Sequence, residues 1–204
     1  MFARLPITFT FLSVLLWHPQ TAVAANCTSA STRLLTPYAE AGDAEAQFTL
    51  SQSLSGLECD DAELATAMFW LDRAAQSGHP EAAFYFGIRL ILGEDVLQDQ
   101  PRGFQFLTTA AEAGLVESQH HLGLLLLEAS ETEAMKEEGF YWLGAATAQG
   151  DVISAITISQ VYKYGLHGVP KNQCLAFDWL ETARLLAVDA AQDVPPPIPA
   201  VGGC

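Results

Sequence analysis

The chain of 204 residues is half hydrophobic by composition and carries 24 acidic against 9 basic residues, a formal net charge of −15. This acidity makes nucleic acid and anionic lipid surfaces poor partners, because both repel a strongly negative protein. We therefore expect a soluble domain, large enough for one continuous core, that binds no nucleic acid and inserts into no membrane.

Residues 1–25 have the three parts of a secretory signal peptide. Met1–Arg4 is a short basic start, Leu5–Trp17 is an apolar stretch too short to span a bilayer, and Ala22–Ala24 is a small-x-small cleavage signal. Asn26 precedes Cys27, which disfavours a lipid anchor because a small residue is needed there. The sequence predicts a periplasmic protein of a Gram-negative bacterium, with 8 basic and 24 acidic residues and a net charge of −16 after cleavage.

A glycine recurs every 36 residues in the part that follows. Such a strict period indicates a repeat array. Residues 26–43 are expected to form an N-terminal capping helix, and residues 44–188 four repeats of 36 or 37 residues, at 44–78, 79–114, 115–150 and 151–188. A proline-rich tail, 189–204, ends the chain. The four glycines are Gly42, Gly78, Gly114 and Gly150.

Each repeat is predicted to contain two helices, A and B. Small and large residues, such as Ala82 and Phe86, lie three or four positions apart on both sides of each glycine, which is the spacing of one helical face. The glycine is predicted to end helix B in the left-handed conformation. The capping helix is expected at about 30–41, A helices at about 44–56, 80–92, 116–129 and 152–164, and B helices at about 61–77, 100–113, 134–149 and 172–188.

The segment Ala44–Ser51, followed by Phe69–Gly78, resembles the Sel1-like repeat family, a relative of the tetratricopeptide repeat. The loop Gly165–Asn172 is similar to the family's loop between its two helices. The resemblance covers about residues 30–188 and implies an all-α fold, a right-handed superhelical solenoid of antiparallel helix pairs. It also implies an adaptor or scaffold in protein complexes, without shared catalytic residues or a cofactor.

Four cysteines lie after the signal peptide: Cys27, Cys59, Cys174 and Cys204. An even number in an oxidising compartment favours disulfides over metal binding or catalysis. In the topology that the resemblance implies, Cys27 and Cys59 lie at the same edge of the stack, and the extended tail allows Cys204 to return to Cys174. We expect each of these two disulfides to stabilise one end of the solenoid.

Acidic residues gather in or beside the loops between A and B helices. This distribution predicts one acidic edge of the stack. The edge is either a solvated, solubilising surface or a surface that steers a basic protein partner. Its residues are Glu58, Asp60, Asp61, Glu63, Glu94, Asp95, Asp99, Glu128, Glu131, Glu133, Glu137 and Glu138.

The concave face of such a solenoid is lined by helix A, and its residues are the predicted partner-binding residues. They change from repeat to repeat while the core positions do not, which is expected of a scaffold that recognises one partner and also of unconstrained surface. They are Glu45, Thr49, Gln52, Glu81, Tyr85, Arg89, Glu117, His121, Leu125, Thr157, Gln160 and Tyr164.

Signatures of an enzyme are weak. His120 and His121 are adjacent, so their side chains point about 100 degrees apart on a helix and cannot share a metal ion. His120 occupies the position of Phe48 and Phe84, which favours packing, and His79 is placed in a turn. The chain has no nucleophile elbow, phosphate loop or dinucleotide fingerprint. We predict no catalytic residue, metal or cofactor.

The sequence therefore favours a non-enzymatic periplasmic repeat protein that binds a protein partner, such as a basic toxin or an envelope protein, through its concave face and acidic edge. One alternative, which rests on the resemblance, is an immunity protein that neutralises a secreted phospholipase-type toxin. A second is an envelope regulator or an enzyme acting on cell wall or β-lactams. The partner and the oligomeric state are left open.

Overall fold

The computed structural model describes residues 30–56 and 60–191, and every regular element in that part of the chain is helical. The helix bounds agree with those expected from the 36-residue period to within three residues. The elements are α1 Ala30–Glu40, α2 Ala44–Ser53, α3 Asp61–Gln76, α4 Pro80–Leu92, α5 Gln100–Glu112, α6 Val116–Glu128, α7 Glu133–Ala148, α8 Val152–Tyr164, the short 3-10 helix η1 Leu166–Gly168, and α9 Gln173–Ala191.

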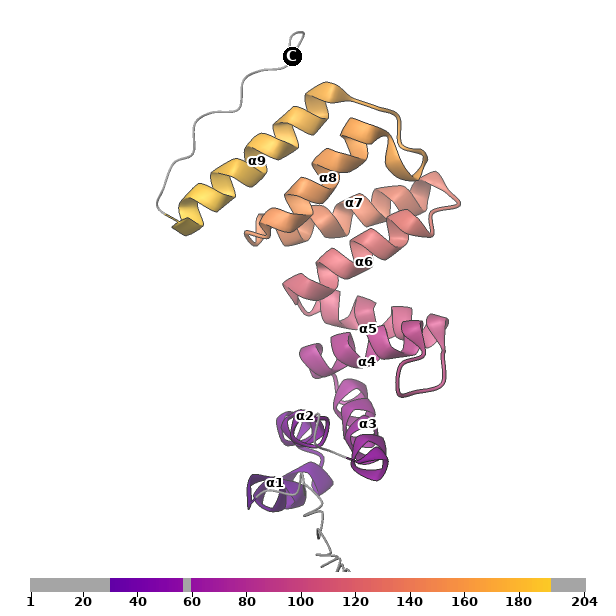
Figure 1. Cartoon of the computed structure of the whole chain (residues 1–204), viewed down its shortest axis with the longest axis vertical. Coiled ribbons are helices and arrows are strands. Elements are labelled where there is room, and N and C mark those ends of the chain that lie inside the picture. The colour runs from indigo at the N-terminus through magenta and orange to yellow at the C-terminus, as the bar shows by residue number, and fades with distance from the viewer. Residues whose placement is uncertain (1–29, 57–59, 192–204) are drawn as a thin grey trace, which may run out of the picture.

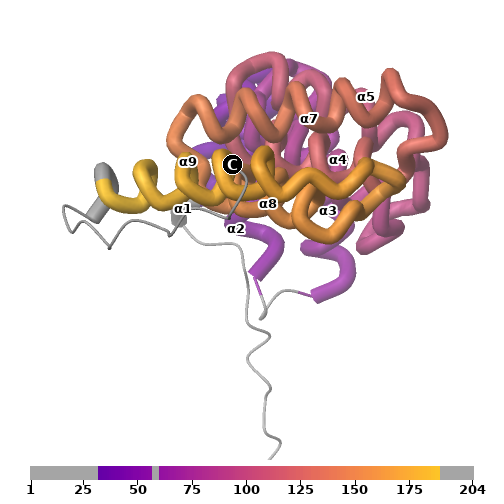
Figure 2. The backbone as a smooth tube through the Cα atoms, turned by 90° about the horizontal axis from the view of Figure 1, so that it is seen from above, coloured from indigo at the N-terminus to yellow at the C-terminus, as the bar shows by residue number. Residues whose placement is uncertain are grey.

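The helices stack one after another from α1 at one end to α9 at the other (Figure 1). Each helix packs mainly against the helices next to it in the chain. Figure 2 looks along the stack, with α8 and α9 in front of the earlier pairs. Contacts that lie within a repeat or between adjacent repeats are typical of a repeat solenoid, so the predicted fold class is confirmed.

The four recurring glycines end the B-type helices, as predicted. Their φ angles are 96°, 83°, 91° and 97°, in the left-handed region. No atom lies within 4 Å of a Cβ added at any of the four. The backbone conformation, rather than a lack of space, therefore requires glycine at these turns.

Two other glycine pairs let the helices of one repeat approach closely. A Cβ added to Gly103 would lie 2.8 Å from the carbonyl oxygen of Gly87, and one added to Gly139 would lie 2.9 Å from that of Gly123. The pairs join α4 to α5 and α6 to α7. In the fourth repeat Ser159 and Ala176 replace the two glycines. Ser159 Oγ donates to the Ala176 carbonyl at 2.6 Å.

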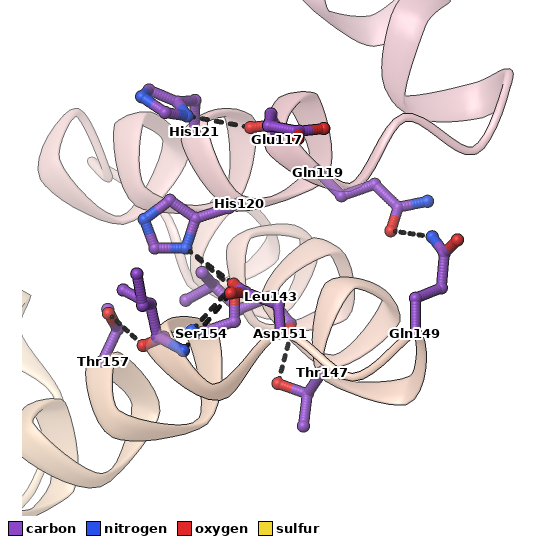
Figure 3. Close-up of polar contacts among 11 residues, drawn as sticks. Glu117, Gln119, His120, His121, Leu143, Thr147, Gln149, Asp151, Ser154 and Thr157 are labelled. Atoms are coloured by element: carbon purple, nitrogen blue, oxygen red, sulfur yellow. Dashed lines mark hydrogen bonds and ion pairs between the residues drawn. The ribbon is translucent and has the colours of Figure 1, made fainter. Parts of the chain in front are cut away.

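Two buried glutamines connect an A helix to the last turn of the helix before it by a hydrogen bond. Gln47 Nε2 donates to the Ala39 carbonyl at 2.9 Å, and Gln119 Nε2 donates to the Ala111 carbonyl at 3.0 Å. Gln119 Oε1 also accepts from Gln149 Nε2 at 2.8 Å, as Figure 3 shows. Within the described residues Gln47 Oε1 has no hydrogen-bond partner.

Ser77 is equivalent to Gln149 in the repeat that lies two repeats earlier. We expect Ser77→Gln to stabilise the protein. The new amide would donate to Gln47 Oε1, which should raise the free energy of unfolding by about 0.5–1.5 kcal/mol in urea titrations. Ala113→Gln is the matched control, because Ala83 stands where the buried glutamine would be. Equal stabilisation by both substitutions would contradict the predicted bond.

Several predicted features lie outside the described residues: the signal peptide, Cys27, Cys59, Cys204 and tail residues 192–204. Cys174 is the second residue of α9. Signal-peptide cleavage and both disulfides therefore stay predictions. None of the helices in the described ranges is long and apolar enough to cross a membrane.

Candidate partner-binding groove

Three hollows follow one another along the first helices of the repeats, with volumes of about 190, 250 and 360 Å³. The first and second share Tyr85 and Arg89, and the second and third share His121, so together they form one surface that we call the groove. The first is lined by Phe48, Ser51, Gln52, Ser55, Met68, Leu71, Tyr85 and Arg89, the second by Phe84, Tyr85, Ile88, Arg89, Glu94 and His121, and the third by Val116, Glu117, His120, His121, Asp151 and Ile153.

A continuous strip of aromatic rings runs along the groove, and we call it the ring strip. It crosses α2, α4 and α6, and each ring packs against the next by stacked, tilted or edge contacts, as aromatic side chains prefer. The ring centroids are 4.5 Å apart for His79 and Phe48, 6.1 Å for Phe48 and Tyr85, 5.2 Å for Tyr85 and Phe84, 5.2 Å for Phe84 and His121, and 5.4 Å for His121 and His120.

His79 begins the strip and also caps α4. Its Nδ1 accepts from the Ala82 N–H at 3.4 Å, and its Nε2 lies 3.0 Å from a Glu45 carboxylate oxygen. The first contact uses a lone pair on Nδ1, and the second uses a proton on Nε2. Glu81 is close as well, with a carboxylate oxygen 3.2 Å from Nδ1. The imidazole thus lies between carboxylates from two successive repeats.

His120 ends the strip beside the N-terminus of α8 (Figure 3). Its Nδ1 lies 2.8 Å from Ser154 Oγ and 3.4 Å from an Asp151 carboxylate oxygen. Asp151 caps α8 by accepting from the N–H groups of Ile153 and Ser154. Because the hydroxyl and the carboxylate approach the same nitrogen, these groups do not form a Ser-His-Asp relay, which uses the two opposite nitrogens.

The electrostatics of this corner favour neutral His120 and ionised Asp151. Burial lowers the pKa of His120 below its usual value, and the nearby charge of Asp151 only partly opposes this. Burial alone would raise the pKa of Asp151. Hydrogen bonds from Ser154 and from the backbone N–H of Ile153, together with His120, outweigh it and hold the pKa below its usual value.

His120 should therefore make folding stability depend on pH. Because its pKa is lowered in the folded state, the unfolded chain binds the proton more readily. The contribution is present above a pH of about 6.5 and is lost as the pH falls from there toward the folded pKa. We expect His120→Gln, which keeps a hydrogen-bond acceptor for Ser154, to flatten urea stability profiles between about pH 8 and 5. Profiles of equal slope would contradict the assignment.

Comparison with protein families decides what kind of repeat this is. Residues 44–79, 80–115, 116–151 and 158–186 match the Sel1 repeat. The chain belongs to the Sel1 repeat family. No protein with a curated description matches it.

Solved structures with TM-scores above 0.5 show the same fold as this Sel1 repeat protein. A protective antigen of uropathogenic Escherichia coli with an SLR fold is 30% identical, with a TM-score of 0.63 over 74% of this chain and 32% of that chain. A Sel1 repeat protein from Oxalobacter formigenes is 25% identical, with a TM-score of 0.59 over 79% of this chain and 48% of that chain. The chain thus spans about a third and about half of the lengths of these two proteins. An immunity protein from Pseudomonas aeruginosa is 16% identical, with a TM-score of 0.48 over 78% and 73% of the two chains.

Seven of the twelve predicted partner-binding residues lie in or beside the groove. Glu45 and Glu81 flank His79. The other five line the hollows, and His121 is held by a hydrogen bond of 2.8 Å from its Nδ1 to the Glu117 carbonyl. These five are Gln52, Tyr85, Arg89, Glu117 and His121.

The remaining five of the twelve predicted residues do not line these hollows. Thr49 is half-buried in α2, and Leu125 packs against the core. Thr157 Oγ1 donates within its own helix, to the Ile153 carbonyl at 2.9 Å. Gln160 and Tyr164 are exposed farther along α8, where the Lys163 ammonium lies 5.1 Å from the centre of the Tyr164 ring.

Sequence reasoning missed four rings of the strip. Phe48, Phe84 and His120 share a position six residues after the repeat glycines, which predicts packing residues. They are partly or wholly buried, yet they also line the hollows. His79, placed in a turn by the sequence, is the N-cap of α4. A run of aromatic residues at one repeat position was the signal that could have revealed Phe48, Phe84 and His120, whereas no such run marks His79.

The predicted acidic edge contains several acids with local structural tasks. Asp60 and Glu63 form a capping box at the start of α3, and Asp99 caps α5. Asp95 binds Arg89 at 2.7 Å, and Glu133 lies 3.2 Å from the Lys136 ammonium. These contacts support helix ends, so the edge is less free for a partner than its charge suggested.

Proposed function

We propose that this Sel1 repeat protein is a non-enzymatic periplasmic protein that binds a protein partner through the groove. Proteins built from these repeats are typically interaction scaffolds, which supports the binding role. The predicted signal peptide supports the location.

The observation that carries the proposal is the continuity of the groove. Its hollows share side chains across helices of successive repeats, and the ring strip runs along them. Tyr85 is 48% exposed although it stacks with Phe48, so much of its surface is open to a partner. Exposed, rigid aromatic side chains flanked by polar groups are typical of the centres of protein interfaces.

The chemistry of the groove supports binding rather than turnover. His120, the histidine held by Ser154 and Asp151, is not arranged as a proton relay. Among the described residues, no group of three or more histidine, cysteine, aspartate or glutamate side chains is placed to hold a metal ion.

The test is affinity capture from the cell envelope with three forms of the protein. Tyr85→Ala with His121→Ala removes two exposed rings from the groove, and is expected to reduce capture of the partner at least tenfold. Phe69→Ala with Tyr141→Ala is the matched control, because these exposed rings lie on α3 and α7 and line none of the three hollows. Equal capture by all three forms would overturn the proposal.

An immunity role is the second candidate, and the acidity of the chain favours it. A strongly negative protein attracts a basic toxin and accelerates their encounter. If the role is correct, the purified protein should inhibit a phospholipase toxin encoded beside it at equimolar ratio. A toxin that remains fully active at a tenfold excess of this protein would exclude the role for that pair.

A further inference from the structure

We propose that the groove binds an extended, basic segment of its partner, with arginine or lysine side chains placed against a row of three glutamates. This inference rests on the proposed function, because it specifies the chemistry of the partner at the same site. The three glutamates are Glu45, Glu81 and Glu117, and we call them the carboxylate row.

The carboxylate row follows from the repeat. Each glutamate is the second residue of its helix, in α2, α4 and α6. The solenoid therefore presents one carboxylate per repeat along the same side of the groove. The side chains of Glu45 and Glu81 are 77% and 49% exposed. In the fourth repeat Ile153 takes this position and is 63% exposed, so the row ends there.

Within the described ranges, no lysine or arginine pairs with the carboxylate row. The ion pairs there join lysines and arginines to other acids, as Arg102 does to Asp72. Arg89, the arginine of the groove, is held by Asp95 at 2.7 Å, which offsets its charge. Beside the row, the imidazole of His79 lies between Glu45 and Glu81, with Nε2 3.0 Å and Nδ1 3.2 Å from their carboxylate oxygens. The row is thus open to an incoming cation.

The ring strip supplies the second half of the recognition. A guanidinium or ammonium group is attracted to the face of an aromatic ring as well as to a carboxylate. Tyr85 lies in α4 between the carboxylates of α2 and α6, with its ring exposed. A basic side chain that enters the groove can therefore lie against an aromatic face while its charge meets a glutamate.

An extended segment fits this geometry better than a helix end or a single loop residue. The A helices that carry successive carboxylates lie about one helix diameter apart, roughly 10 Å. Three residues of extended chain cover about the same distance. The expected ligand thus carries basic residues about three positions apart, which matches the carboxylate row one to one.

The probe is a fluorescein-labelled ten-residue peptide with arginine at every third position and serine elsewhere, measured by fluorescence anisotropy in 0.15 M salt. Changing the carboxylate row to glutamine, Glu45→Gln, Glu81→Gln and Glu117→Gln, is expected to weaken binding about tenfold or more. The control is Glu128→Gln, Glu137→Gln and Glu138→Gln, three exposed glutamates that line none of the three hollows. It removes the same charge and should change affinity less than about twofold.

Thermal unfolding of both triple variants verifies that they fold. Equal weakening by the two triples would mean a general attraction to an acidic protein, and it would overturn the inference, as would unchanged or absent binding. A peptide with glutamine in place of arginine should not bind. If partner capture depends on Tyr85 and His121 while peptide binding ignores the carboxylate row, the proposed function stands and this inference fails.

Discussion

Gly139→Ala should destabilise the protein, although alanine is the better helix former. The new Cβ would lie 2.8 Å from Leu127 Cγ and 2.9 Å from the Gly123 carbonyl oxygen. A backbone carbonyl in the facing helix cannot rotate away as a flexible side chain can, so α6 and α7 must separate. Overpacking of this kind costs about 1–3 kcal/mol. For a chain of this size the melting temperature should fall by about 2–4 °C for each kcal/mol.

Gly144→Ala, five residues later in the same helix, is the matched control. An added Cβ there meets no atom within 4 Å. The gain in helix propensity is then unopposed, and we expect a rise of about 0.5–1 kcal/mol in the free energy of unfolding. Thermal or urea unfolding of both variants separates the two effects. A Gly139→Ala protein as stable as Gly144→Ala would show that the close approach of α6 and α7 is not needed.

The order and bounds of the helices could be predicted because the 36-residue period repeats the same signals. The capping helix and the first three B helices each end at a glycine with a positive φ, and this turn conformation fixes where the next A helix begins. The close approach of the helices could be predicted only as a run of small residues. The sequence does not say which of them, such as Gly139 rather than Gly144, lies against a neighbouring backbone.

The groove could be predicted less well, because its residues occupy two kinds of repeat position. Some positions vary between repeats, and others are shared with core residues. Tyr85 and His121 lie at positions that vary between repeats, which predicts partner-binding residues. Phe48 and His120 share a position with core residues, yet line the same hollows. Contacts between repeats decide such cases. His79 caps its own helix and stacks on Phe48 of the previous repeat, a relation that no local pattern contains.

Leu143→Ala should reduce stability by about 2–5 kcal/mol, the range for removing a buried leucine side chain. Leu143 is fully buried, and its cluster joins Leu127 of α6 to Ile158 and Val161 of α8. The lost side chain would thus leave a cavity where the third and fourth repeats meet. Leu92→Ala is the control, because Leu92 is 57% exposed at the end of α4, and its change should stay within about 0.5 kcal/mol.

The double variant of Leu143→Ala and Gly123→Ala tests whether Leu143 requires a glycine at position 123. A Cβ on Gly123 would lie 2.8 Å from Leu143 Cγ, so part of its cost comes from the leucine side chain. Leu143→Ala removes that atom, and the two changes together should cost less than the sum of the single changes by about 0.5 kcal/mol or more. The 2.8 Å contact with the Gly139 carbonyl oxygen would persist, so the coupling cannot be complete. Strict additivity would show that Leu143 and Gly123 are independent, whereas coupling would explain why the leucine needs the glycine opposite it.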